Sequence, residues 1–179
     1  MEEIELVKAC KRKSKKAQKE LYEKYQEQMF RLCYRYLGNV HDAEDIVVEG
    51  FLKIFDKINT VEYRNVGSFI NWMKTIMINE SLMFLRKNKR IQFIEHDLII
   101  EQESQIENSM ELAEILKLLA CMPDGYRTIF NMYIIEGYSH NEISEKLEIN
   151  IQTSKSQLSR AKKYLEKQIK ELNYERRAV

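Results

Sequence analysis

The chain is poor in the residues that interrupt helices. Its 179 residues include one proline and five glycines, and the alternation of polar and apolar residues that marks strands is hard to find. Because proline and glycine break helices, their scarcity favours long ones and predicts an all-α protein. A chain of this length is enough for one ordinary domain or two small ones.

Cysteine and long apolar runs are also scarce. Cys10, Cys33 and Cys121 lie far apart and show no Cys-x-x-Cys or Cys/His spacing, so no structural metal site is expected. Each lies among apolar neighbours, and we expect buried thiols in a reducing compartment. No apolar run is long enough to cross a bilayer and no signal peptide is visible, which favours a cytoplasmic protein.

The sequence also lacks the usual marks of an enzyme. His41, His96 and His140 have no cysteine or carboxylate set at ligand spacing near them, and no glycine-rich phosphate loop is present. We therefore expect no catalytic residues, no metal, no cofactor and no small-molecule substrate.

What the chain does have is segregated charge. The net charge is only +1, yet the basic residues fall into three blocks and an acidic run separates the last two. This pattern favours phosphate contacts at separate places over simple solvated helix faces. The basic blocks are Lys8, Lys11, Arg12, Lys13, Lys15, Lys16 and Lys19; Arg86, Lys87, Lys89 and Arg90; and Lys155, Arg160, Lys162, Lys163, Lys167 and Lys170.

The first half of the chain is predicted to be a helical bundle. A long apolar-faced helix ends at Gly38, and a second helix begins near Asp42 with acidic residues in its first turn. Residues 59–68 are polar and predicted to be a loop, from which Ser68 caps a third helix that runs to about Asn88. The predicted buried side of the second helix is Ile46, Val47, Phe51, Leu52, Ile54, Phe55 and Ile58.

Residues 91–108 show no firm period and are dominated by Glu and Gln, as in an acidic, loosely ordered linker. The predicted domains are therefore residues 1–90 and 109–179. The second is predicted to be a four-helix unit, in which Met122-Pro123 ends the first helix and Asp124 starts the next. The apolar stripe predicted for that next helix is Tyr126, Ile129, Phe130, Tyr133 and Ile134.

Residues 126–163 are the most informative segment. Ser139 and Glu142 fit a capping box, residues 148–150 form a short turn, and Asn150 is placed to cap the final helix. That helix keeps one apolar face and carries amide, hydroxyl and guanidinium groups on the others, the groups that contact base edges and phosphates. Two helices joined by a short turn occur in many proteins, but together with the basic second helix they favour a DNA-binding helix-turn-helix.

The residues carry a resemblance that covers almost the whole length. The segments 42–55, 67–90 and 122–165 are similar, in order and spacing, to three parts of an extracytoplasmic-function sigma factor of the sigma-70 family. These are the polymerase-binding helix, the helix that meets the −10 promoter element, and the domain that reads the −35 element. Glu148 departs from the pattern, because it stands where the family commonly has glycine.

The resemblance implies a factor that binds the RNA polymerase core through its largest subunits, recognises promoter DNA and helps to open the duplex. An anti-sigma protein holds many relatives inactive, so such a partner is also implied. The acidic linker is expected to pass through the polymerase toward the RNA exit path, where its charge mimics nucleic acid.

The site residues that the resemblance implies form three sets. Asp45, Val48, Glu49 and Leu52 face the polymerase. Lys53, Tyr63, Arg64, Asn65, Lys74, Asn79, Arg86 and Lys87 contact the −10 element, with Tyr63 and Asn79 holding a flipped base. Gln152, Thr153, Lys155, Ser156, Ser159, Arg160 and Lys163 contact the −35 element. Trp72 lies in an apolar stripe and is predicted to belong to the hydrophobic core.

Two alternatives stay open. One is a helix-turn-helix regulator that binds its operator unaided, usually as a dimer on palindromic half-sites. The other is a helical adaptor that binds only protein partners, which the basic helix after Asn150 disfavours.

Overall fold

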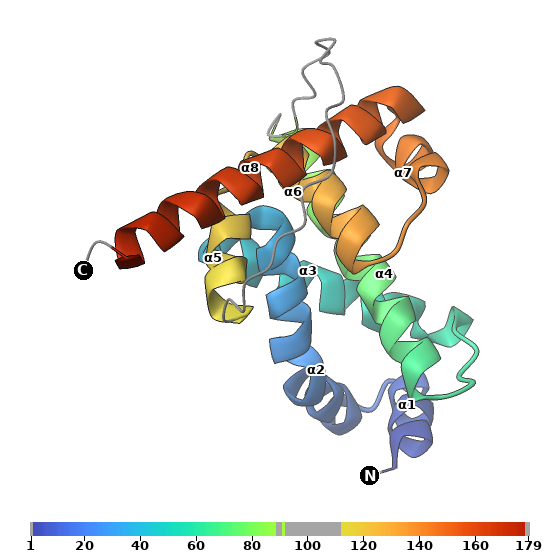
Figure 1. The fold of residues 1–179 in the computed structure, drawn as a ribbon. Coiled ribbons are helices and arrows are strands. Elements are labelled where there is room, and N and C mark those ends of the chain that lie inside the picture. Colours follow the sequence, from blue (N-terminus) through green and yellow to red (C-terminus); the bar gives the residue numbers. More distant parts are fainter. Residues whose placement is uncertain (1, 89–90, 92–111, 178–179) are drawn as a thin grey trace. The chain divides into compact units, whose positions relative to one another are not determined.

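The computed structural model describes residues 2–88, 91 and 112–177 (Figure 1). These residues form helices and no strand, so the all-α prediction is confirmed. The chain divides into two compact units, Met1–Asn88 and Lys89–Val179. The predicted linker, residues 91–108, lies outside the described residues except for Ile91.

The first unit is built from helices α1 (Glu3–Lys11), α2 (Lys15–Leu37), α3 (Val40–Lys57) and α4 (Val66–Lys87), with a 3₁₀ turn η1 (Ile58–Thr60) after α3. Helices α2, α3 and α4 pack on one another, and α1 packs on α2 (Figure 1). Helix α1 was not predicted, because its basic residues conceal a buried side formed by Leu6, Val7 and Cys10.

Local side-chain chemistry sets the helix ends of this unit. Gly38 adopts the left-handed conformation (φ 66°) that ends α2, as predicted. Asn39 caps α3 by accepting a hydrogen bond from the Asp42 N–H at 3.1 Å, so this helix starts slightly earlier than expected. The prediction that Ser68 caps α4 is wrong. Asn65 is the cap, and Ser68 completes its capping box from inside the helix.

Most of the apolar positions predicted for the first unit lie in its hydrophobic core. Tyr36, Phe51 and Met73 are fully buried. Trp72 is only half-buried and stacks on Phe69 with ring centroids 5.7 Å apart. The prediction that Leu52 is buried is wrong, because the pitch of α3 turns it to the solvent side, where it is 65% exposed.

Two of the three cysteines behave as predicted. Cys10 and Cys33 are buried, and burial raises the pKa of the Cys10 thiol to about 11 and that of Cys33 to about 12. Both thiols are therefore protonated at neutral pH. The prediction is wrong for Cys121, which is exposed because Leu119 and Met122, on either side of it, face the core instead.

The second unit contains α5 (Leu112–Cys121), α6 (Asp124–Phe130), a π-helical turn η2 (Asn131–Ile135), α7 (His140–Leu147) and α8 (Ile151–Arg177). A cluster of Leu119, Met122, Ala161 and Leu165 joins α5 to α8. Tyr126, Phe130 and Tyr164 are among the partly buried residues that pack against this cluster.

The π-helical turn changes which side chains of this region are buried. Tyr133 and Ile134 are 37% and 47% exposed, whereas Met132 is buried. The predicted stripe is therefore wrong at Tyr133 and Ile134. A π turn has more residues per turn than an α-helix, so positions after Phe130 rotate away from the expected face.

The helix-turn-helix has the predicted local structure. Ser139 and Glu142 form the capping box of α7, and the hydrogen bond from the Ser139 backbone keeps the pKa of Glu142 below its ordinary value. Asn150 accepts a hydrogen bond from the Gln152 N–H at 2.8 Å at the start of α8. Glu148 ends α7 in the left-handed region (φ 56°), which explains why glycine suits this position.

Replacing Glu148 with glycine is expected to stabilise the second unit by roughly 1 kcal/mol, because a residue with a Cβ atom is strained in the left-handed region. Amide hydrogen exchange of α7 and α8 in the full chain measures this change.

The matched control is Glu148→Ala, which removes the same carboxylate but keeps the Cβ atom. It should leave the exchange close to that of the original chain. Equal stabilisation by alanine and glycine would show that charge, and not backbone strain, sets the stability of this turn.

Candidate functional site

The four residues predicted to face the polymerase all lie on one exposed side of α3. Asp45 and Glu49 are exposed carboxylates, and Val48 and Leu52 are exposed apolar side chains at 51% and 65%. Their spacing of three and four residues makes them neighbours on the helix surface. The structure thus brings the whole set together as a mixed acidic and apolar surface, here called the α3 face.

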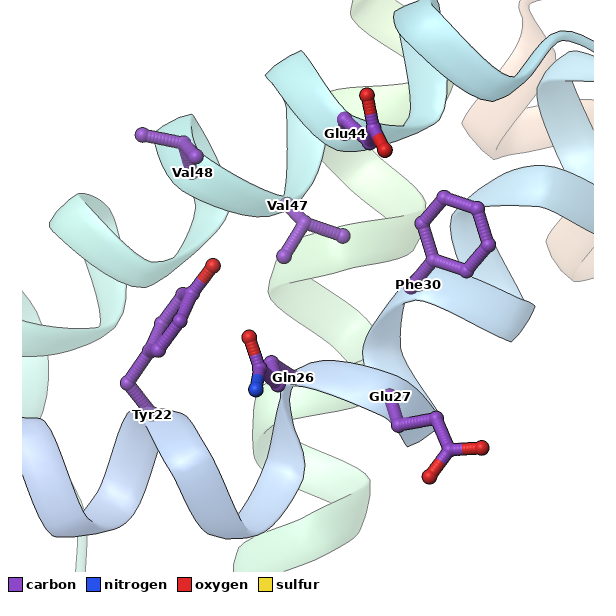
Figure 2. Close-up of a pocket in the computed structure, with 7 residues that line it drawn as sticks. All are labelled: Tyr22, Gln26, Glu27, Phe30, Glu44, Val47 and Val48. Carbon is purple, nitrogen blue, oxygen red and sulfur yellow. The ribbon is translucent and has the colours of Figure 1, made fainter.

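A groove lies between α2 and α3, beside the α3 face. Its volume is about 610 Å³, and Tyr22, Gln26 and Phe30 of α2 point toward α3 in Figure 2. The apolar lining is supplied by Tyr22, Phe30, Val47 and Val48, with Glu27 and Glu44 as acidic members. Because Val48 belongs to both surfaces, the groove and the α3 face are continuous.

The loop before α4 holds three of the predicted −10 residues in different environments. Tyr63 is half-buried, and its ring lies 6.0 Å from that of Phe69. Arg64 is exposed and forms an ion pair with Glu62 at 3.6 Å. The side-chain oxygen of Asn65 accepts from the Ser68 N–H at 2.8 Å, so this residue has a structural role as well.

Helix α1 holds this loop in place, a role that the sequence analysis missed. The Lys11 ammonium donates a hydrogen bond to the Val61 carbonyl at 2.7 Å. Glu3 accepts a hydrogen bond from the Tyr25 hydroxyl, and the Tyr25 ring lies 6.5 Å from Phe69, the ring that Tyr63 also contacts. These contacts join residues far apart in the sequence, so periodicity alone could not have identified them.

The remaining predicted −10 residues do not form one cluster. Asn79, Arg86 and Lys87 are exposed on α4, and Lys74 is half-buried on the same helix. Lys53 lies on α3 and is ion-paired with Glu80, a carboxylate that is only 7% exposed. Because Glu80 is nearly buried, Lys53 neutralises it in addition to any contact it makes with a phosphate.

On α8 the predicted −35 residues differ in accessibility. Gln152, Lys155 and Lys163 are exposed, whereas Ser156, Ser159 and Arg160 are half-buried. Thr153 is buried, with 8% of its surface accessible. The exposed and half-buried side chains form the surface from which α8 can contact a groove of DNA.

A polar contact fixes the start of α8 against α7. The Nδ1 atom of His140 lies 2.9 Å from the hydroxyl oxygen of Ser154, which is fully buried. The His140 ring stacks on Tyr133 with centroids 4.4 Å apart. Desolvation lowers the pKa of His140, and the nearby charge of Lys155 lowers it further. The predicted first-turn position of His140 is correct, but its bond to Ser154 had no signal in the sequence.

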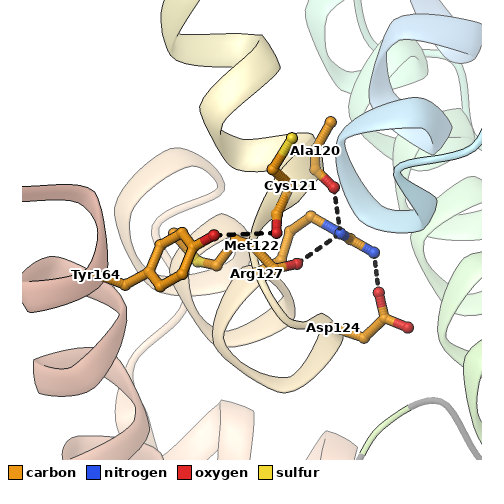
Figure 3. A network of polar contacts seen from close by, with 6 residues as sticks. All are labelled: Ala120, Cys121, Met122, Asp124, Arg127 and Tyr164. Carbon is orange, nitrogen blue, oxygen red and sulfur yellow. Dashed lines mark hydrogen bonds and ion pairs between the residues drawn. The ribbon is translucent and has the colours of Figure 1, made fainter. Parts of the chain in front are cut away.

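A buried guanidinium connects α5 to α6. Arg127 is 2% exposed and donates to the carbonyl oxygens of Ala120 at 2.9 Å and Met122 at 2.8 Å, and it is ion-paired with Asp124 (Figure 3). The Tyr164 hydroxyl donates to the Cys121 carbonyl at 3.2 Å, which ties α8 to the same corner. Polar partners thus satisfy the last carbonyls of α5, which a helix leaves unpaired.

Two further observations concern the described ranges 2–88, 91 and 112–177. Within them, no three His, Cys, Asp or Glu side chains are grouped so that they could hold a metal ion. No helix in the same ranges combines the length and the apolar character needed to cross a membrane.

Comparison with known proteins gives consistent matches along the chain. The family model of sigma-70 region 2 matches residues 21–91, and that of sigma-70 region 4 matches residues 112–165, so together they cover more than half of the chain.

Curated relatives match over similar lengths. The chain is 29% identical to the ECF RNA polymerase sigma factor SigW of Bacillus subtilis, over 93% of this chain and 96% of that protein. It is 29% identical to the RNA polymerase sigma factor SigV of the same organism, over 81% and 86%. The ECF RNA polymerase sigma factor SigE of Mycolicibacterium smegmatis is also 29% identical, over 82% of this chain and 59% of that protein.

The environment of His140 predicts a pH dependence of the second unit. Its folded-state pKa lies below the ordinary value of about 6.5, so the unfolded state takes up a proton first as the pH falls. The His140 contribution to stability is therefore present above pH about 6.5 and is lost as the pH falls toward the lowered pKa. The opening free energy of α7 and α8, obtained from amide exchange relative to the intrinsic rate at each pH, should fall between pH 7.5 and 5.5.

His140→Gln keeps a polar side chain that does not titrate, so the opening free energy of this variant should depend less on pH. The fluorescence of Trp72, which reports the first unit, serves as an internal reference. The same pH dependence in the His140→Gln variant would assign the effect to other groups.

Proposed function

The chain belongs to the sigma-70 family, in its extracytoplasmic-function group of RNA polymerase sigma factors, and we propose which of its surfaces carry out each step. Its function is promoter recognition and transcription initiation, performed by binding the polymerase and DNA. The composition of the α3 face is the observation that most supports the assignment of a partner-binding surface. That face exposes two large apolar side chains that the first unit does not use in its own core.

The α3 face is the proposed polymerase-binding surface. Val48 and Leu52 supply apolar area that loses contact with water on binding, and Asp45 and Glu49 supply negative charge for a basic partner helix. The groove between α2 and α3 adjoins this face and offers space for a side chain of the partner. The largest subunits of the polymerase core are the proposed partners.

The loop before α4, together with α4 itself, is the proposed surface for the −10 element. Tyr63 presents a ring that is held by Phe69, and Asn79 is an exposed amide able to contact a base edge. A base held out of the stack needs both a stacking face and hydrogen-bond partners. Arg64, Arg86 and Lys87 are exposed cations suited to the phosphates of the opened strand.

Helix α8 is the proposed reader of the −35 element. Lys155, Ser156, Ser159 and Arg160 are the residues proposed for the groove and base edges, and Gln152 and Lys163 for phosphates. The buried Thr153 has only a small proposed role, because little of its side chain reaches the surface.

An anti-sigma protein is a further proposed partner, and its proposed binding site is the α3 face. Val48 and Leu52 expose apolar area to water, and a bound protein would shield that area while the chain is not bound to the polymerase. Because the anti-sigma protein and the polymerase would bind the same face, the chain could not bind both at once. The proposed compartment is the cytoplasm, where RNA polymerase acts.

Leu52→Asp is expected to weaken binding to the polymerase core enzyme on the order of tenfold or more, because it places a charge where apolar area is buried on binding. Titration of core enzyme with the labelled chain measures the affinity.

The matched control is Met83→Asp, which changes a side chain of similar exposure (55%) on α4 of the same unit. Its affinity should stay close to that of the original chain. Equal losses for the two variants would remove the α3 face from the interface.

Arg160→Ala is expected to weaken promoter binding by about 1–3 kcal/mol if Arg160 reads a base, with the loss concentrated at one position of the −35 element. Holoenzyme binding to a series of −35 variants measures both the size and the selectivity of the loss.

Lys163→Ala serves as the phosphate-type comparison. It should weaken binding almost equally on all sequences and reduce the salt dependence. A uniform loss for Arg160→Ala, similar to that of Lys163→Ala, would reject the base-reading role.

A further inference from the structure

Helix α1 lies outside the part of the chain that the family models match. The match to sigma-70 region 2 begins at residue 21, whereas α1 spans Glu3–Lys11. The helix packs on α2 and also against η1, the turn that leads into the loop before α4. The family match therefore assigns no role to α1, although this helix adjoins the loop proposed to hold the flipped base.

One end of α1 holds the backbone of that loop. The Lys11 ammonium donates a hydrogen bond of 2.7 Å to the carbonyl oxygen of Val61, a residue that is only 8% exposed. A carbonyl with little access to water needs a donor within the protein, and a charged donor gives a stronger bond than a neutral one. Because Val61 lies two residues before Tyr63, this bond fixes the backbone from which the Tyr63 ring projects.

The other end of α1 supports the rings that lie behind Tyr63. Glu3, whose side chain is 8% exposed, accepts a hydrogen bond from the Tyr25 hydroxyl and forms an ion pair with Lys24. Tyr25 and Phe69 are buried, and their ring centroids are 6.5 Å apart. The Phe69 centroid lies 6.0 Å from that of Tyr63, which is half-buried. The two buried rings therefore form a fixed support for a third ring that reaches the surface.

A loop that captures a base benefits from being held before the base arrives. Residues 61–65 are neither helix nor strand, so side-chain contacts have a large part in setting their conformation. The ion pair of Arg64 with Glu62 joins two exposed side chains, and such pairs stabilise a loop only weakly. Ordering the loop only on binding would cost conformational entropy and weaken the captured state. Contacts that fix the loop in the free chain therefore raise its affinity for an extruded base.

We propose that α1 acts as a clamp on the loop before α4, with Lys11 as a positioning residue that keeps Tyr63 ready to stack on the flipped base. This inference rests on the proposed function of the −10 surface and adds to it a helix that does not touch the base. Lys11 belongs to a basic block of the sequence, but it acts through the Val61 carbonyl and not through a phosphate. Its effect is therefore confined to base capture and does not extend to the general affinity for DNA.

The test compares open promoter fragments with and without the flipped base. The −10 region of a promoter that the holoenzyme uses is held open by mismatches, and each base of either opened strand is removed in turn to leave an abasic site. Stacking of one base on an aromatic ring is worth about 5- to 100-fold in affinity, so the position with the largest loss identifies the captured base. The ratio of the two affinities at that position, measured with core enzyme in excess, is here called the base-capture factor.

Lys11→Met removes the ammonium but keeps a long apolar side chain. It is expected to lower the base-capture factor by roughly 3- to 10-fold, on the order of the net contribution of one hydrogen bond. Affinity for core enzyme and for the abasic fragment should stay the same. Lys11→Arg keeps a charged donor and should retain most of the factor. The matched control is Lys8→Met, which removes an exposed ammonium from the same helix and should leave the factor unchanged.

Glu3→Ala tests the other end of α1. It removes the acceptor of the Tyr25 hydroxyl without changing the loop, so it should also lower the base-capture factor. Trp72 fluorescence during thermal unfolding reports whether each variant retains the first unit, and Glu3→Ala decides the question if Lys11→Met does not fold. Amide exchange of residues 61–65 in the full chain should become faster in both variants but not in Lys8→Met.

The outcomes separate the clamp from the proposed function. If the original holoenzyme captures one base and both α1 variants keep its full factor, the inference is overturned and the −10 assignment stands. If Lys11→Met and Lys8→Met weaken binding equally on the normal and the abasic fragment, Lys11 contacts phosphate, which also overturns the inference. If removal of no single base weakens binding by the original holoenzyme, the proposed function of the −10 surface fails and the inference fails with it.

Discussion

Helix α3 must satisfy two surfaces at once, and the architecture of the first unit depends on this constraint. One side supplies Val47, Phe51 and Ile54 to the hydrophobic core, where all three are nearly or fully buried. The other side keeps Val48 and Leu52 in solvent. Helices α2 and α4 pack against the first side and leave the second side without cover within the unit. The helix is therefore both a structural element and a surface available to a partner.

The second unit meets a different requirement, because a helix proposed to read DNA must be held rigidly while its outer side chains stay available. Buried polar groups do this work. Arg127 donates to the Ala120 carbonyl near the end of α5, and Ser154 contacts His140 across the turn between α7 and α8. Such groups are costly to bury unless paired, so they favour one arrangement of the helices over alternatives. Family membership places this helix-turn-helix in a factor that works with polymerase, which separates it from a regulator that binds unaided and from a protein-only adaptor.

Much of this structure followed from local patterns. The all-α fold, the capping box at Ser139 and the stop at Gly38 depend on nearby residues, and the sequence predicted each of them. The errors come from the geometry of individual helices. The π turn exposed Tyr133 and Ile134, and the pitch of α3 exposed Leu52.

The site residues also fall into two groups, those that local patterns could place and those that they could not. The residues of the α3 face are exposed, which agrees with the surface role predicted for them. The contacts of Lys11 with Val61 and of Lys53 with Glu80, in contrast, join segments that are distant in the sequence. No periodicity signals such pairs. A basic pocket between α2 and α4 had no signal either, since Lys74 of α4 is brought beside Arg31 and Arg35 of α2 only when the helices pack.

The most direct measurement maps transcription start sites. Purified core polymerase is incubated with genomic DNA, with and without the chain, and the 5′ ends of the transcripts are sequenced. The account predicts a new set of start sites that share two upstream elements at constant spacing, and that depend on the chain. An unchanged set of start sites would contradict the claim that this chain directs the polymerase to promoters.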